Sequence, residues 1–548
     1  MNMKLKVIAA ACLAMCASSA FAATLTPAQI AAAAAAAAVP ATICGTATAA
    51  DAIVNSCAPQ VKMFIAGSSA LGDALGKVVV KDLFDTTTQP IISVVDTSGG
   101  PQASSTKAWY GMSKSSLTTA SKWLYVVYNK NNGSAAGVSQ LLGATKTAAE
   151  AVVVSVGPKT AKTGGSNSCV LASTSTTLVP VVNCGSTDVV TAADMAISDV
   201  HPAELYKLYP TATAKLSTLT STPLALQGFG VAVSWDLYVA LQNRNIAEGL
   251  LASTCAASTA TTCQPSVRSA DYASLVTKQG SIKTATAFLG DTTDLNSLTL
   301  ARRDDLSGTQ ASSNIFFADN SCGGMGYGLG GTNYGTTGVA TVNGFNYSPA
   351  TSKLDKTLTA IMGGGLDVIG SAAAAATPAA VGVLRNDTTT YPGLTVMSAV
   401  AGGDVTNQLN VVATAPAVNY SIGAISLTSA FANTVNTWKF VKIDGVSPVY
   451  NPDGTASYKQ RTQFANGNYP FAVQSYAVSP VKPVAGSVGD ATKGYPKVVA
   501  AVIAGLKDSS LHDLTGIAYQ DGVADAAGVP KQALVHRTAG NNCSPLIK

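Results

Sequence analysis

The stretch LTLARRDDLSGTQ at residues 298–310 decides the fold, because an apolar strand, a charged turn and small hydroxyl residues follow one another directly. Ser307, Gly308 and Thr309 stand where such a turn opens a helix. A helix N-terminus offers unpaired N–H donors and a partial positive charge, which suit an anion. Serine and threonine add neutral donors, glycine lets the backbone approach, and Arg303 supplies a bidentate guanidinium. The stretch therefore predicts an anion-binding turn.

Three other segments have the same feature, a turn of small hydroxyl or acidic residues before a helix. They are Gly67-Ser68-Ser69, Gly133-Ser134-Ala135-Ala136-Gly137 and Ala196-Ile197-Ser198-Asp199. Taken singly, each is more simply explained as an ordinary helix N-cap, because serine and aspartate are preferred at that position. Their order along the chain is more informative than any one of them.

Strands and helices alternate around these turns. Val61 to Ala66 predicts a strand, and Ala70 to Phe84 has the apolar spacing of a helix. A second unit follows the same plan, with a strand from Trp123 to Tyr128 and a turn at residues 131–134. Alternation of this kind predicts an α/β sheet. The Ser/Thr/Gly-rich segments 94–120 and 155–190 are typical of surface insertions.

The pattern R-x-D-x-S-G-T at residues 303–309 resembles the signature of the phosphate-binding proteins of ABC transporters, a family of periplasmic substrate-binding proteins. Residues 268–282 (RSADYASLVTKQGSI) are similar to that family's segment before the signature. Residues 67–69, 128–142 and 197–199 resemble its phosphate loops. Tyr469-Pro470-Phe471 and residues 420–424 (YSIGA) also fit, and the order is collinear from residue 61 to about 515.

This resemblance implies a two-lobed periplasmic binding-protein fold, in which two α/β lobes are joined by crossing strands. In this chain the lobes would also carry surface insertions and disulfides. Lobe 1 would comprise residues 61–227 and return at 426–548, and lobe 2 would comprise 228–425. Gly228 to Ser234 (GFGVAVS) would be the first crossing strand. The ligand would lie in the interlobe cleft, and the lobes would close on it by a hinge.

The resemblance also implies roles for single residues. Ser68, Ser69 and Ser134 would donate hydrogen bonds, Arg303 would grip two oxygens, and Asp305 would orient Arg303. Ser307, Gly308 and Thr309 would complete the cradle at the helix start. Asp199 would accept a hydrogen bond from a protonated phosphate oxygen. Because sulfate has no proton near neutral pH, a carboxylate at that place favours phosphate.

Residues 1–22 are typical of a secretory signal peptide, with Lys4 and Lys6 before an apolar stretch and Ala20-Phe21-Ala22 as the cleavage site. Cys16 offers a lipoprotein interpretation, which is disfavoured because Met15 is too large for the position before a lipidated cysteine. Residues 23–60 form an alanine-rich leader. No later stretch is apolar for about 18 residues without a break. The sequence thus predicts a periplasmic or secreted product without a membrane span.

Eight cysteines follow the signal peptide, an even number that predicts disulfides in an oxidising compartment. Three pairs are local: Cys44 with Cys57, Cys169 with Cys184, and Cys255 with Cys263. The remaining Cys322 and Cys543 would form the fourth. Metal binding is disfavoured, because there is no C-x-x-C and the three histidines are scattered.

Composition excludes some functions and leaves others open. The net charge of +5, of which the signal peptide holds two lysines, is too small for a nucleic-acid binder. The sequence predicts capture of phosphate or a similar tetrahedral oxyanion and no cofactor or catalysis, with an ABC permease as a possible partner. A secreted structural or adhesive protein on the same fold is the alternative. A phosphate-releasing hydrolase is disfavoured, because no metal cluster or catalytic triad is recognisable.

Overall fold

The computed structural model describes residues 61–86, 91–96, 106–118, 121–130, 133–141, 193–205, 213–276, 281–282, 284–303, 307–318, 393–399, 402–413, 415–481, 496–508 and 513–519, with short strand segments within 153–190, 333–385 and 536–547. The predictions for the signal peptide, the leader and Asp305 lie outside these residues. The same holds for the three cysteine pairs other than Cys255 with Cys263, of which the described strands include Cys184 alone.

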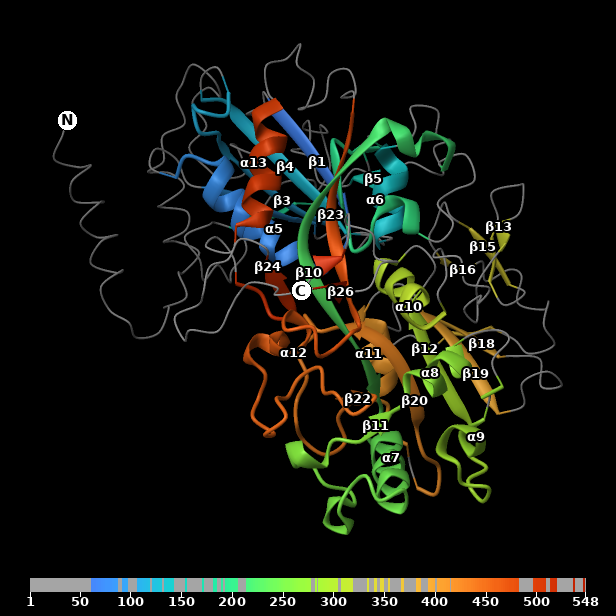
Figure 1. Ribbon diagram of the computed structural model, residues 1–548. Coiled ribbons are helices and arrows are strands. Elements are labelled where there is room, and N and C mark those ends of the chain that lie inside the picture. Colours follow the sequence, from blue (N-terminus) through green and yellow to red (C-terminus); the bar gives the residue numbers. More distant parts are fainter. Residues whose placement is uncertain are drawn as a thin grey trace.

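One continuous sheet runs through both lobes in the order β17-β18-β19-β12-β20-β10-β23-β9-β1-β4-β3-β2-β7-β6. Lobe 1 lies at the top of Figure 1 and lobe 2 below it. The principal lobe 1 strands are β1 (Val61–Gly67), β2 (Ile92–Asp96), β3 (Thr106–Met112), β4 (Trp123–Asn129) and β9 (Met195–Ser198). The principal lobe 2 strands are β12 (Leu298–Arg303), β18 (Val381–Arg385), β19 (Leu394–Ala399) and β20 (Tyr420–Ser426). The predicted class, two α/β lobes joined by crossing strands, is confirmed.

Strand β10 (Leu219–Val233) belongs to both lobes. Its first part, residues 219–228, pairs with β23 (Ala472–Pro480), and its last part, 229–233, pairs with β20. The predicted crossing strand, Gly228 to Ser234, therefore covers the lobe 2 end of a longer strand. Figure 1 shows β10 and β23 running side by side between the lobes.

Lobe 1 has the strand and helix order that the sequence predicts. In β1 the side chains of Val61, Met63 and Ile65 are buried, and β1 pairs in parallel with β4 and β9. The predicted helix from Ala70 to Phe84 forms as α5 (Gly72–Val78) followed by a π-helical turn (Val79–Leu83). Its apolar face packs beneath α13 (Pro496–Lys507), so a segment near the C-terminus completes lobe 1.

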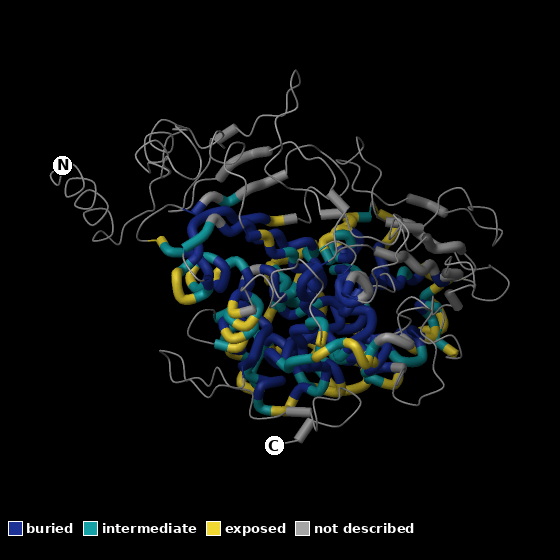
Figure 2. Tube along the Cα trace, turned by 90° about the horizontal axis from the view of Figure 1, so that it is seen from above, coloured by how far each residue is buried: buried dark blue, intermediate teal, exposed yellow. Residues whose placement is uncertain are grey.

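Lobe 2 is built from β12, β19 and β20 with helices α7 (Trp235–Ala247), α8 (Ser269–Val276), α10 (Gly308–Ala318) and α11 (Gly402–Leu409). Two short strands, β21 (Lys439–Phe440) and β22 (Lys442–Ile443), pair with β10 and with β11 (Ser266–Val267). Figure 2, a view from above, shows buried residues in the middle of the molecule, and one apolar cluster contains residues from each lobe.

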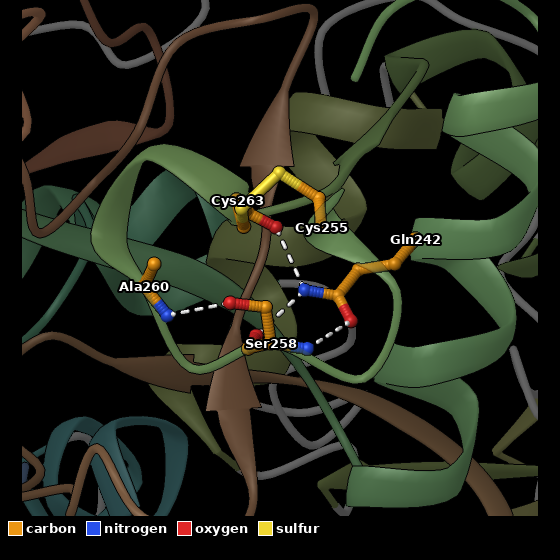
Figure 3. The surroundings of a disulfide bond; sticks show 5 residues. All are labelled: Gln242, Cys255, Ser258, Ala260 and Cys263. Carbon is orange, nitrogen blue, oxygen red and sulfur yellow. Dashed lines mark hydrogen bonds between the residues drawn. A yellow bond between two sulfur atoms is a disulfide. The ribbon is translucent and has the colours of Figure 1, made fainter. Parts of the chain in front are cut away.

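The predicted disulfide between Cys255 and Cys263 is confirmed. Both cysteines are buried, and the loop that they close lies against α7 (Figure 3). The side chain of Gln242 on α7 donates to the carbonyls of Ser258 (2.7 Å) and Cys263 (2.9 Å). The backbone N–H of Ser258 donates back to Gln242 Oε1 (3.2 Å). The disulfide and one buried amide together hold this loop on lobe 2.

Candidate functional site

The turn after β1 brings Ser68 into the interior. Gly67 has a φ of 124°, and a Cβ there would collide with the carbonyl of Ile197 on β9. The Ser68 N–H donates to that same carbonyl (2.8 Å). Ser68 is consequently buried, whereas the next residue, Ser69, is exposed. Of the two serines predicted at this turn, Ser68 is the one that faces the other site residues.

Asp199 lies at the end of β9 and joins two of the predicted loops. The hydroxyl of Ser68 donates a hydrogen bond to Asp199 Oδ1. The backbone N–H of Asp199 donates to the hydroxyl oxygen of Ser134 (3.0 Å). All three residues are buried. Residues 68, 134 and 199, far apart in the sequence, thus form one polar cluster.

Ser134 stands in the first turn of α6 (Gly133–Leu141), which packs closely on the end of β1. A Cβ at Gly137, one turn further along, would lie 2.5 Å from the Cα of Gly67. Two glycine backbones therefore touch where α6 meets β1. This approach places the start of the helix beside the Ser68 turn, where its N–H groups suit negative charge.

Lobe 2 meets this cluster through the start of α10. A Cβ at Gly308, the first residue of α10, would lie 2.6 Å from the Cβ of Asp199 and closer still to Asp199 Oδ2 and Ser134 Oγ. Ser307 and Thr309 on either side are buried. Residues 307–309, predicted as a ligand cradle, therefore lie directly against the lobe 1 residues predicted for the same ligand.

Arg303 ends β12 just before this turn, and only 8% of it is exposed. Its guanidinium Nη1 would be 3.8 Å from a Cβ on Gly402, the first residue of α11. A third helix start is therefore close to this side chain. The neighbouring Arg302 points elsewhere, since it lines a small cavity in lobe 2 with Tyr272, Gln310 and Ser313.

The environment of Asp199 changes its affinity for a proton. Burial raises the pKa of its carboxyl, because the charged form loses its hydration. The Ser68 hydrogen bond, the positive charge of Arg303 and the Ser134 hydroxyl act in the opposite direction and compensate in part. The carboxyl is thus easier to protonate than a surface aspartate, and a guanidinium lies within electrostatic reach of it.

One residue to which the sequence assigns no role of its own supports the site. The phenol of Tyr128, next to the last residue of β4, donates to the backbone carbonyl of Ser68. Tyr128 is fully buried, and its ring lies 3.2 Å from where a Cβ on Gly72 would be. In the sequence Tyr128 is one of several aromatic residues in an apolar strand, so only its distance to the Ser68 turn reveals this contact.

The cluster combines hydroxyl donors, helix N-termini, a guanidinium and a buried carboxyl. Such a set can bind an oxyanion that carries a proton, with the carboxyl as acceptor and the other groups as donors. Among the described residues, no three histidine, cysteine or acidic side chains are grouped so that they could hold a metal ion. Within the same residues, no helix is long and apolar enough to cross a membrane.

Comparison with known proteins gives structural matches alone. No family model matches the chain. No curated protein matches it either. An ABC-type phosphate transport receptor from Vibrio cholerae matches 82% of this chain and 94% of its own, at 11% identity and a TM-score of 0.33. PstS from Borrelia burgdorferi matches 82% of this chain and 94% of its own, at 10% identity and a TM-score of 0.29. With TM-scores this low, the case for a function rests on the residues of the site.

Proposed function

We propose that this chain is an exported solute-binding protein that captures phosphate or a similar tetrahedral oxyanion between its lobes and catalyses no reaction. The observation that carries the proposal is the meeting of Ser68, Ser134 and Asp199 with the start of α10, with the charge of Arg303 within electrostatic reach of Asp199. These groups come from both lobes. An anion bound among them would therefore tie the lobes together.

The chemistry of each group supports a protonated tetrahedral anion. Arg303 supplies a fork of donors, and the hydroxyls and helix starts supply neutral ones. The raised pKa of Asp199 favours sharing a proton with a ligand oxygen of similar basicity. An anion without a proton would face an unshared carboxylate at the same place.

The proposal includes an export route and a division of the chain. The signal peptide would be removed after Ala22, and the mature protein would act in the periplasm or outside the cell. Lobe 1 would comprise residues 61–227 with the return 426–548, and lobe 2 residues 228–425. Within the return, β21 and β22 pair with lobe 2 strands, so the chain re-enters the lobe 1 sheet only at β23. Release of the anion to an ABC permease would complete its transport.

One observation favours the alternative of a structural or adhesive protein. The Asp199 carboxylate itself lies against the first residue of α10, where it meets the partial positive charge of the helix. A carboxylate in this place can hold the lobes together as a permanent contact. In that case the site would serve cohesion between the lobes and would not admit an anion.

A thermal shift experiment distinguishes the two candidates. Phosphate at about 1,000 times its Kd should stabilise a binding protein by roughly 4 kcal/mol. Sulfate at the same ionic strength should have much less effect. No shift with either anion would favour the structural protein.

Replacing Arg303 tests the site itself. Arg303→Ala should weaken phosphate binding at least about tenfold, because a hydrogen bond to a charged group contributes roughly 1.5–3 kcal/mol. Arg268→Ala is the matched control, since that arginine is 68% exposed and pairs with Asp271 on lobe 2. Calorimetry should show equal affinity in the control and the unmutated protein. Unchanged binding in Arg303→Ala would refute the site.

A further inference from the structure

A second interlobe contact lies away from the candidate site. The segment 457–461 follows β21 and β22, which pair with lobe 2, while residues 513–516 directly precede β24 (Ile517–Tyr519) on lobe 1. In Figure 1, α6 and α10 lie to one side of β10 and β23, and α12 (Thr462–Ala465) and β24 lie to the other. Contacts between the lobes therefore flank the crossing strands on both sides.

Asp513 joins two cations of the facing segment. Arg461 Nη1 lies 2.6 Å from Asp513 Oδ1, and Lys459 Nζ lies 2.7 Å from Asp513 Oδ2. Lys459 also donates to the Asp513 carbonyl (2.9 Å), and Arg461 donates to the Ile517 carbonyl (3.3 Å). Burial alone would raise the pKa of Asp513, but the hydrogen bonds and charges of Lys459 and Arg461 bring it below its usual value. The carboxylate is thus ionised and shared by both cations.

Arg461 makes this contact more than a surface ion pair. Its side chain is fully buried, while those of Asp513 and Lys459 are 24% and 33% exposed. The ring of Tyr458 lies 5.1 Å from its guanidinium carbon. A buried guanidinium needs its counter-charge, because the cost of removing it from water is not otherwise compensated.

The backbone links this contact to the point where β10 passes between lobes. The Gly516 N–H donates to the Lys459 carbonyl (2.8 Å), and the Gly228 N–H donates to the Gly516 carbonyl (3.0 Å). At Gly228, β10 changes from pairing with β23 to pairing with β20. Lys459 and Gln460 have positive φ values of 44° and 53°, which non-glycine residues adopt at some cost. Favourable contacts must hold the segment in this shape.

We propose that Asp513 is a positioning residue, which clasps lobe 2 to lobe 1 beside the crossing strands and thereby keeps the two halves of the candidate site together. The effect on ligand binding rests on the proposed function. If the clasp opens, α10 loses its fixed place against Ser134 and Asp199. The apparent Kd then rises in inverse proportion to the fraction of molecules that remain closed.

The test uses the full chain and Asp513→Asn, which keeps the shape and removes the charge. Hydrogen exchange should become at least tenfold faster at the amides of Gly228 and Gly516. Exchange in β4, within the core of lobe 1, should stay unchanged. Asp513→Glu should restore slow exchange in part. Asp453→Asn is the matched control, because it removes one charge from an exposed turn of the neighbouring segment.

Lys459→Met provides a second variant, which leaves the buried Arg461 paired with Asp513. It should accelerate hydrogen exchange at the same amides by a smaller factor than Asp513→Asn does. Phosphate affinity should fall about threefold or more in Asp513→Asn and recover in Asp513→Glu. If the unmutated protein binds no phosphate, the proposed function fails. The exchange rates then test by themselves whether Asp513 holds the lobes together. Equal acceleration at Gly228, Gly516 and β4 would mean general destabilisation and would overturn the proposal, as would unchanged exchange at all of them.

Discussion

A single methyl group at Gly308 should separate the lobes. In Gly308→Ala the new Cβ would lie 2.6 Å from the Cβ of Asp199. Carbon atoms in ordinary contact stay about 3.5 Å apart, so one partner must retreat by about 1 Å. Asp199 has little freedom to do so, because it is buried and bonded to Ser68 and Ser134. The strain should therefore appear as a displacement of α10 from lobe 1.

The expected change in stability is opposite in sign to the change that helix propensity alone predicts. Alanine is favoured over glycine inside a helix by up to about 1 kcal/mol, so an isolated α10 would gain stability. Overpacking of a closed contact typically costs about 1–3 kcal/mol. We expect a net loss of unfolding free energy of about 1–2 kcal/mol for Gly308→Ala. Phosphate binding should weaken in parallel, since the cradle and Asp199 no longer meet.

Gly403→Ala is the matched control. Gly403 lies in the first turn of α11, and no atom lies within 4 Å of a Cβ placed there. This variant should be neutral or slightly stabilising. Urea denaturation gives the free energies of unfolding, and calorimetry gives the affinities. If Gly308→Ala behaves like Gly403→Ala in both measurements, the lobes do not meet at this glycine.

Two further predictions concern titratable residues near the site. Asp199→Asn should weaken phosphate binding and allow sulfate to bind, because an amide can turn its NH₂ toward an unprotonated oxygen. Calorimetry with both anions at fixed pH measures this. Unchanged selectivity would mean that Asp199 does not contact the ligand. Burial lowers the pKa of His201, whose Nδ1 accepts the Ala203 N–H. Its neutral form therefore contributes stability that is fully present above about pH 6.5 and is lost as the pH falls through its folded pKa. Asparagine can still cap the turn, so His201→Asn should make the free energy of unfolding less dependent on pH in this range. An unchanged pH dependence in urea denaturation would contradict the lowered pKa of His201.

The sequence predicts the local elements of this fold well. The strand predicted from Val61 is β1, the strand from Trp123 to Tyr128 is β4, and the helix expected after Ala70 is α5 with its π turn. These elements can be predicted because each depends on the apolar periodicity of a short stretch of sequence. The R-x-D-x-S-G-T pattern likewise marks the end of β12 and the start of α10.

The contacts between distant segments could not be predicted in the same way. Which of Ser68 and Ser69 turns inward depends on the backbone of Gly67 and on the carbonyl of Ile197. The support from Tyr128 and the pairing of Arg461 with Asp513 join residues that are more than 50 positions apart. No pattern within a short stretch of sequence indicates which distant residues come into contact. The sequence therefore indicates which residue types could bind an anion but not how they face one another.

The strand order has a consequence for the way the chain reaches its native state. In lobe 1, β23 lies between β9 and β10, although residues 472–480 are made long after both neighbours. Until then each of those two strands presents an unpaired edge, which is a template for pairing with another chain. Contacts of such large sequence separation also form slowly, because the loop between them must first be closed. During synthesis, the lobe 1 sheet thus stays incomplete, with two open edges, until β23 has been made.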